Sequence, residues 1–272
     1  MPSGASRTEY LMPDSRFLAG HHAVVTGAGR GIGAAIAAAL AGAGARLTLM
    51  GRDRKRLDTL AGSLARDHRV ETAAVPCDVT EAASVAEAFL VARETFGPPR
   101  VLVNNAGQAV GGPFTETTLA TWNALIAVNM TGAFLCMQQV VLAMVEAGAG
   151  RIVNIASVSG LKAFQMVSAY TASKHGLVGL TKAVAAEVAK AGVTCNAVCP
   201  AYTADTAMAS QAEASLVAAG RTPEDARRMM LRTVPRGSLI TPAEVAAAVL
   251  WLCTPAAAAV NGQAIVLAGG EP

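Results

Sequence analysis

Short apolar runs rich in β-branched residues alternate along the chain with longer Ala-rich stretches whose apolar positions recur at helical spacing. The short runs hold few polar positions, which is typical of parallel strands covered on both faces by helices. The alternation predicts an α/β fold with a doubly wound parallel sheet of about seven strands. The predicted strands are residues 22–26, 46–50, 70–76, 101–104, 151–155, 194–198 and 264–267. The predicted helices are residues 32–43, 54–67, 82–95, 121–145, 169–191 and 243–252.

No linker or internal repeat divides this pattern, so we predict a single domain over residues 20–272. Residues 1–19 are charged and lack an apolar run, which indicates a poorly ordered lead-in and not a secretory signal. Residues 201–236 break the alternation with weakly helical patches. A connection this long indicates a substrate lid, although a plain surface insertion would give the same pattern.

Glycines crowd the junction between the first predicted strand and the first predicted helix: Gly27, Gly29, Gly31 and Gly33. Glycine lets the backbone turn sharply and approach a pyrophosphate, and the helix N-terminus that follows offers N–H donors. A glycine cluster alone is a weak signal, but at a strand-to-helix junction it indicates a Rossmann-type dinucleotide site.

Polar residues also follow the third and fourth predicted strands. Asp78 could accept a hydrogen bond from an adenine amino group, or it could cap the next helix. Asn104, Asn105 and Gly107 close the fourth strand at the edge of the sheet that a ligand would cross, although a plain Asn–Gly turn has the same composition.

A Tyr and a Lys four residues apart, Tyr170 and Lys174, open a long predicted helix and can share one of its faces. A nearby ammonium would favour the phenolate and lower the tyrosine pKa, which suits an acid/base in carbonyl chemistry. Ser157, at the end of the preceding strand, could hold the substrate oxygen beside that tyrosine. His175 is a weaker candidate base, because the Tyr–Lys pair already provides proton transfer.

Taken together, these motifs resemble the classical short-chain dehydrogenase/reductase family, over about residues 18–270. The resemblance implies that Tyr170 is the acid/base, that Ser157 binds the substrate oxygen, and that Lys174 binds the nicotinamide ribose. It implies that the helix backbone at Asn129 holds a water that links Lys174 to solvent. The positions it assigns to cofactor binding are Gly27, Gly29, Arg30, Gly31, Ile32, Gly33, Arg52, Asp78, Val79, Asn105, Ala106, Gly107, Tyr170, Lys174, Pro200, Tyr202 and Thr203.

Three positions depart from the family pattern. Ala201 replaces the usual glycine after Pro200, and Asp205 stands where the family has a threonine that contacts the carboxamide. A shift of one residue would give that contact to Thr206. Ala268 stands where many members have aspartate, which bears on packing or subunit contacts.

The end of the second predicted strand predicts a preference for NADP(H), with NAD(H) possible. NAD-specific members of the family resemble one another in placing an acid at the position of Gly51, where it would repel a 2′-phosphate. Here Arg52 follows the glycine, and Arg30 could reach the same phosphate. The alternatives are that both arginines are solvated surface charges and that Asp53 either caps the next helix or binds the ribose.

We therefore predict an NAD(P)-dependent oxidoreductase that reduces a medium-sized hydrophobic ketone or a 3-oxoacyl compound such as a thioester. An NAD-dependent 3-hydroxyacyl or alcohol dehydrogenase, a related isomerase or dehydratase, and a dinucleotide-sensing protein are the alternatives. The predicted substrate-binding residues are Ser157, Gln108, Phe164, Tyr170 and Tyr202, with Val110, Met166 and Met208 as further candidates.

Composition excludes other classes of function. The chain has 53% apolar residues, 15% charged residues and a net charge of +3, with no basic stripe, so we expect no nucleic-acid partner. Its apolar runs are interrupted, so no membrane span is expected. Five cysteines without disulfide or zinc-site spacing indicate packing thiols in a cytoplasmic protein, and no metal is expected. Apolar helices over residues 121–145 and 169–191 predict a homotetramer.

Overall fold

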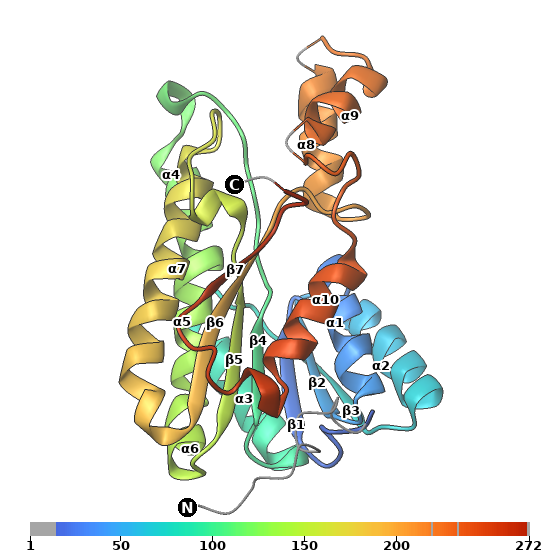
Figure 1. The fold of residues 1–272 in the computed structure, drawn as a ribbon, viewed down its shortest axis with the longest axis vertical. Helices are drawn as coiled ribbons and strands as arrows, with labels where there is room; N and C mark the ends of the chain where they lie inside the picture. The colour runs from blue at the N-terminus through green and yellow to red at the C-terminus, as the bar shows by residue number, and fades with distance from the viewer. Residues whose placement is uncertain (1–14, 219, 233, 271–272) are drawn as a thin grey trace, which may run out of the picture.

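The computed structural model describes residues 15–218, 220–232 and 234–270. Within them, seven strands form one parallel sheet in the order β3-β2-β1-β4-β5-β6-β7, which confirms the predicted fold class (Figure 1). The strands are β1 (His22–Thr26), β2 (Arg46–Gly51), β3 (Thr72–Pro76), β4 (Val101–Asn104), β5 (Gly150–Ile155), β6 (Val193–Pro200) and β7 (Ala264–Leu267).

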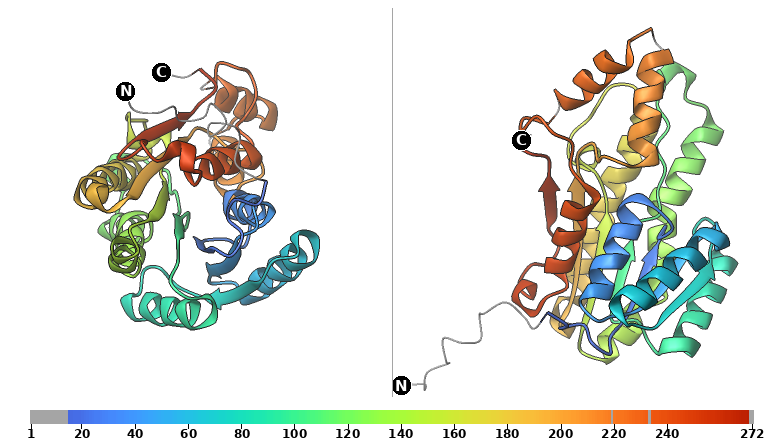
Figure 2. Two further views of the ribbon diagram at one scale, coloured as in Figure 1. Left: turned by 60° about the horizontal axis from the view of Figure 1, so that its bottom comes forward. Right: turned by 90° about the vertical axis from the view of Figure 1, so that its right-hand side faces the viewer.

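Helices cover both faces of the sheet in two layers (Figure 2). The cluster of buried side chains on one face includes α1 (Gly31–Gly42), α2 (Arg54–His68) and α10 (Pro242–Leu252). The cluster on the other face includes α3 (Ala82–Phe96), α5 (Gly132–Gln138), α6 (Val141–Glu146) and α7 (Ser168–Val188). With helices on both sides the strands are largely apolar, which explains why their runs were visible in the sequence.

The strand order reverses between β1 and β4, which are hydrogen-bonded neighbours. Val25 of β1 pairs with Val103 of β4, so the segments that follow Thr26 and Asn104 leave the sheet side by side. In open α/β sheets ligands bind at such a switch point, at the carboxyl ends of the strands. The topology therefore brings the glycine turn and the Asn105–Gly107 segment together.

The helix predicted over residues 121–145 is interrupted twice. α4 (Leu119–Ile126) runs through a π-helical turn (Ala127–Thr131) into α5, and a break at Gln139 and Val140 precedes α6. At the break the amides of those two residues bond carbonyls three residues back, so the helix tightens and stops. By length and composition alone, the helical run Leu119–Gln138 is apolar enough to cross a membrane, a test that core helices of soluble proteins also pass; 28% of its most apolar 18-residue window is buried.

The segment predicted as a lid contains α8 (Ala207–Ala218) and α9 (Pro223–Leu231), which stand above the carboxyl ends of the strands (Figure 1). Of the predicted lead-in, residues 1–14 lie outside the described part of the chain. Leu18 is buried in the core, and its backbone N–H donates to the Ala43 carbonyl, so the packed chain begins before residue 20.

Candidate active site

The glycine turn between β1 and α1 is shaped for close approach of a ligand. Gly27 and Gly31 have φ of 62° and 55°, which side chains other than glycine rarely adopt. A Cβ at Gly33 would lie 2.3 Å from the Gly27 carbonyl oxygen, so only glycine fits there. The N-cap residue Arg30 makes no side-chain cap, which leaves the first-turn N–H groups of α1 available for an anion. The turn therefore fits a dinucleotide pyrophosphate.

Asn105 was predicted as a cofactor residue, and the structure uses its side chain to brace the glycine turn. Its Nδ2 donates to the carbonyl oxygens of Thr26 and Gly27, each at 3.0 Å. The Thr26 hydroxyl accepts from the backbone N–H groups of Asn105 and Ala106 at 3.0 and 3.1 Å. Thr26 was missed in the sequence, where it looks like an ordinary strand residue.

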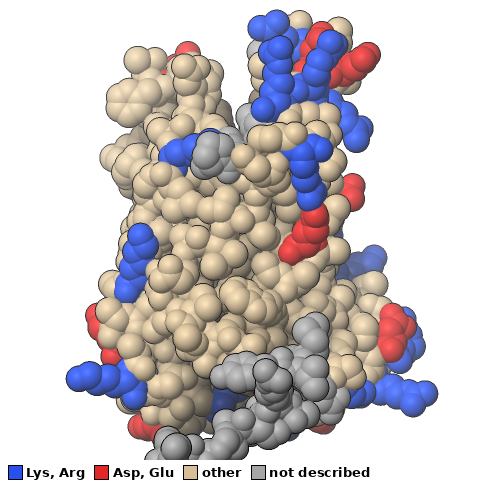
Figure 3. All heavy atoms as spheres, viewed as in Figure 1, with Lys and Arg blue, Asp and Glu red and all other residues tan. Residues whose placement is uncertain are grey.

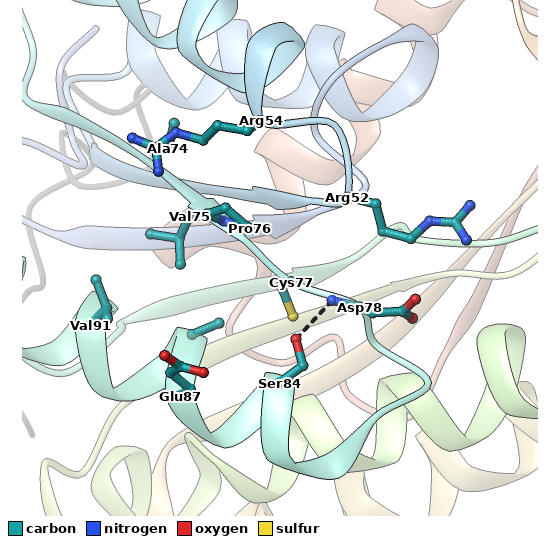
Figure 4. Close-up of a pocket in the computed structure, with 11 residues that line it drawn as sticks. Arg52, Arg54, Ala74, Val75, Pro76, Cys77, Asp78, Ser84, Glu87 and Val91 are labelled. Atoms are coloured by element: carbon teal, nitrogen blue, oxygen red, sulfur yellow. Dashed lines mark hydrogen bonds between the residues drawn. The ribbon is translucent and has the colours of Figure 1, made fainter.

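The contacts of Asp53, which lies just after β2, distinguish between its two predicted roles, helix cap and ribose ligand. Its carboxylate accepts from the Arg56 backbone N–H at 3.1 Å as the N-cap of α2, and it pairs with the Arg56 guanidinium at 2.9 Å. Asp53 is therefore engaged as a helix cap. Arg52 beside it is exposed and borders a groove of about 500 Å³ (Figure 4).

Asp78 lines the same groove from the end of β3 (Figure 4). It does not cap α3, whose N-cap is Glu81. Instead Asp78 accepts from the Thr80 backbone N–H and hydroxyl at 3.0 and 2.7 Å, and these bonds, with the Arg52 charge, hold its pKa below the usual value. The groove thus brings together two predicted cofactor residues, Arg52 and Asp78, from neighbouring strands.

Ser157, Tyr170 and Lys174 come together at the carboxyl end of β5. All three are buried, and the Ser157 side chain lies close enough to the Tyr170 phenol to lower its pKa. The Lys174 Nζ donates to the Ile155 carbonyl oxygen at 2.8 Å and lies 5.8 Å from the centre of the Tyr170 ring. The sequence could not reveal that the Ile155 carbonyl accepts this hydrogen bond from Lys174, because a backbone carbonyl gives no sequence signal.

The direction of the Tyr170 pKa shift differs from the sequence prediction. Burial raises the Tyr170 pKa to about 12, and the nearby Ser157 side chain offsets this only in part. Burial also lowers the Lys174 pKa to about 8. The predicted lowering by the lysine does not dominate, because the ammonium points at the Ile155 carbonyl while the phenol is removed from water. A neutral, buried phenol is a proton donor.

Asn129 lies in the π-helical turn and is 1% exposed. Its side chain accepts from the Gln108 backbone N–H and donates to the Gln108 carbonyl, both at 2.9 Å, and it donates to the Ser173 hydroxyl at 3.0 Å. Ser173 in turn donates to the Tyr170 carbonyl at 2.7 Å. The side chain thus ties the Gln108 segment to the helix that carries Tyr170 and Lys174. The water expected at its backbone stays a prediction.

The base of α8 occupies the carboxyl end of β6. Pro200 ends β6 and is buried, as is Thr203, whose hydroxyl donates to the Ala201 carbonyl. Thr206, the alternative carboxamide contact, caps α8: its hydroxyl accepts from the Ala209 N–H at 3.1 Å and donates to the Thr203 carbonyl at 2.8 Å. The hydroxyl therefore uses both its donor and its acceptor capacity within the segment predicted as a lid.

The remaining predicted residues fall into three groups. Ile32, Val79 and Ala106 are packing positions around the glycine turn and the ends of the strands. Among the predicted substrate residues, Phe164 lies under the Lys162 ammonium, and Tyr202 is close enough to Tyr170 to affect its pKa. His175 is exposed and bonds the Thr171 carbonyl on its own helix, which places it away from the proton transfer.

Apolar and polar side chains both lie near the start of α7, where the polar residues Glu116, Thr117, Thr121 and Ser168 share a cavity with Val110 and Met166. This cavity has a volume of about 130 Å³, and Met208 of α8 accepts a hydrogen bond from the Tyr170 hydroxyl at 3.6 Å. Gln108 is exposed at the surface, with its backbone held by Asn129. In the described part of the chain, no group of three or more His, Cys, Asp or Glu could hold a metal ion.

Comparison with known proteins identifies the family. Residues 21–216 match the family model described as short chain dehydrogenase. A Streptomyces coelicolor protein described as a candidate ketoacyl reductase is 40% identical over 250 residues, 91% of this chain and 95% of its own. A D-threitol dehydrogenase of Mycolicibacterium smegmatis is 38% identical over 93% of each chain. The crystal structure of a single-residue variant of the actinorhodin polyketide ketoreductase with NADPH matches with a TM-score of 0.88 and 39% identity, over 92% of this chain and 97% of that one.

The chain therefore belongs to the short-chain dehydrogenase family. It is an NAD(P)-dependent oxidoreductase that acts on carbonyl and alcohol groups. A nicotinamide dinucleotide supplies or accepts the hydride in this chemistry. The glycine turn, whose Gly33 admits no side chain, fits the pyrophosphate of that cofactor.

Proposed function

We propose that the protein reduces medium-sized hydrophobic ketones, with Ser157, Tyr170 and Lys174 as its catalytic residues. The observation that carries the proposal is the buried Tyr170 hydroxyl beside Ser157, with a pKa raised to about 12. A phenol with that pKa holds its proton at neutral pH and can donate it to a carbonyl oxygen. The Ser157 hydroxyl holds the same oxygen, and the Lys174 ammonium stabilises negative charge nearby.

The surroundings of Tyr170 favour a ketone or 3-oxoacyl group over a small carboxylate. Met208 contacts the Tyr170 hydroxyl, and the nearby cavity lined by Val110 and Met166 offers no cation, while its Glu116 would repel a carboxylate. A relative described as a candidate ketoacyl reductase supports a 3-oxoacyl thioester as one substrate, with residues 201–236 as the lid that covers it. An alcohol dehydrogenase role is the second candidate, supported by the D-threitol dehydrogenase relative. Reduction rates for a panel of ketones, and oxidation rates for the matching alcohols, distinguish the two.

NADPH is the proposed cofactor for this reduction. Arg52 is exposed beside the groove that Asp78 lines, whereas the Asp53 carboxylate is engaged with Arg56. The Arg52 guanidinium is therefore available to bind a 2′-phosphate at the end of β2, and the Asp53 carboxylate there is already paired. The NADPH in a ketoreductase structure similar to this chain supports the same choice.

Replacing Arg52 by Ala is expected to lower kcat/KM with NADPH by about ten- to a hundredfold, because a charged hydrogen bond contributes roughly 1.5–3 kcal/mol. The value with NADH should change less than about twofold. Arg54→Ala is the matched control, since Arg54 lines the far end of the same groove and pairs with Asp58. Steady-state kinetics with both cofactors measure the effect. Equal losses with NADPH and NADH would contradict the assignment.

We also propose a homotetramer in the cytoplasm. Phe134 of α5 and Leu142 of α6 are 41% and 68% exposed, and the face over β7 and α7 is mostly uncharged (Figure 3). Light scattering at micromolar concentration should give the mass of four 27.5 kDa chains, and a monomer mass would refute the assembly.

All five cysteines are free and buried, which supports a reducing compartment. Cell fractionation tests that location.

A further inference from the structure

One contact joins the lid to the catalytic tyrosine. Met208 lies in the first turn of α8, and its Sδ accepts a hydrogen bond from the Tyr170 hydroxyl at 3.6 Å. The sulfur therefore occupies a place at this hydroxyl where the oxygen of a substrate must bind. Tyr170 is 6% exposed, whereas Met208 is 36% exposed, so the thioether lies between the phenol and the open side of the site.

The position of Met208 is set by the base of the lid. Thr206 caps α8 two residues earlier, and its own hydroxyl is bonded to the Thr203 carbonyl. Thr203 is buried and pairs with Ile240, while the Ile240 N–H donates to the Tyr202 carbonyl at 3.0 Å. The first turn of α8 is thus anchored to the body of the protein. Met208 cannot leave the neighbourhood of Tyr170 by movement of the outer part of α8 or of α9 alone.

A thioether sulfur is a weak acceptor, so a carbonyl oxygen displaces it readily from a phenol. After displacement the side chain stays on the anchored turn, where it shares the space beside Tyr170 with the groups attached to the carbonyl. Methionine is unbranched and adapts its shape, but its volume still limits what fits. We propose that Met208 is the residue that sets the size of the substituent accepted beside the reacting carbonyl. This inference rests on the proposed ketone reduction.

The test compares Met208→Ala, which removes volume, with Met208→Leu, which keeps the volume and removes the sulfur. Met229→Ala is the control, because Met229 is an exposed methionine of α9 in the same lid. The probes are cyclohexanone and the bicyclic ketone 2-tetralone, each reduced with NADPH. The readouts are KM and kcat for each ketone and the dissociation constant of NADPH.

Met208→Ala should raise the 2-tetralone to cyclohexanone ratio of kcat/KM by about tenfold, since small changes in pocket volume discriminate by this order. Met208→Leu should lower both KM values by about threefold and leave the ratio within twofold of wild type. The NADPH affinity should not change in either variant. In the control Met229→Ala the 2-tetralone to cyclohexanone ratio of kcat/KM should stay within twofold of the wild-type ratio. The same result in Met208→Ala would overturn the proposal.

A loss of kcat with unchanged KM for both ketones in Met208→Ala would also overturn it, because that pattern indicates a general role in alignment. If the wild type reduces neither ketone, the proposed function fails for this substrate class. Calorimetric dissociation constants of the two ketones then test the size selection without turnover. Met208→Ala should then change the ratio of the two dissociation constants by about tenfold in favour of 2-tetralone. An unchanged ratio would contradict the role of Met208.

Discussion

Replacing Tyr170 by Phe should lower kcat for ketone reduction by at least about a thousandfold, within the range attributed to a positioned acid or base. The ring stays in its buried site against Leu125 and Ala169, so packing is preserved and only the hydroxyl is lost. That hydroxyl is a buried side-chain proton donor beside Ser157. Steady-state and single-turnover kinetics measure the loss.

The internal control for Tyr170→Phe is cofactor affinity, which should stay within a few-fold of wild type because the glycine turn is untouched. The melting temperature should also change little. Near-normal turnover in this variant would refute the role of Tyr170. A loss of NADPH binding as large as the loss of turnover would instead show that the hydroxyl holds the cofactor.

Replacing Lys174 by Met is expected to lower kcat/KM for reduction by about a hundredfold and to change its pH profile. Burial lowers the Lys174 pKa to about 8 and raises the Tyr170 pKa to about 12. Below pH 8 the lysine is cationic and the tyrosine protonated, so wild-type reduction should be fastest there. As pH rises through 8 the lysine loses its proton first, and the rate should fall.

The pH profile of wild type and Lys174→Met, measured from pH 6 to 10, checks this assignment. The decline near pH 8 should be present in the wild type and absent in the variant. A wild-type rate that stays level to pH 10 would contradict it. Lys174→Arg keeps the cation without a proton to lose in this range, so any activity it retains should also lack the decline.

Most of the fold was predictable from the sequence because its signals are local. The strands are four to eight residues long and mostly apolar, and each begins within two residues of its predicted start. The largest difference lies in the helix predicted over residues 121–145, which breaks at Gln139 and Val140. Apolar periodicity continues through that break, because the residues on both sides pack against the sheet. Periodicity reports burial, and it does not show where the backbone bends.

The sequence by itself determined the class of protein and the residue types of the site. Gly27, Gly31 and Gly33 are required by backbone sterics within a few residues, and the Tyr170–Lys174 spacing places both side chains on one helix face. These constraints act over short stretches of chain, so they are visible in the order of the residues.

Only the tertiary structure decided how those groups act on one another. The raised pKa of Tyr170 comes from the burial of its phenol, to which many distant segments contribute. The bracing of the glycine turn by Asn105 and the contact of Met208 with Tyr170 join residues 78 and 38 positions apart. Long-range packing sets the solvation of a buried group and the partners of its hydrogen bonds, and no local pattern in the sequence encodes either.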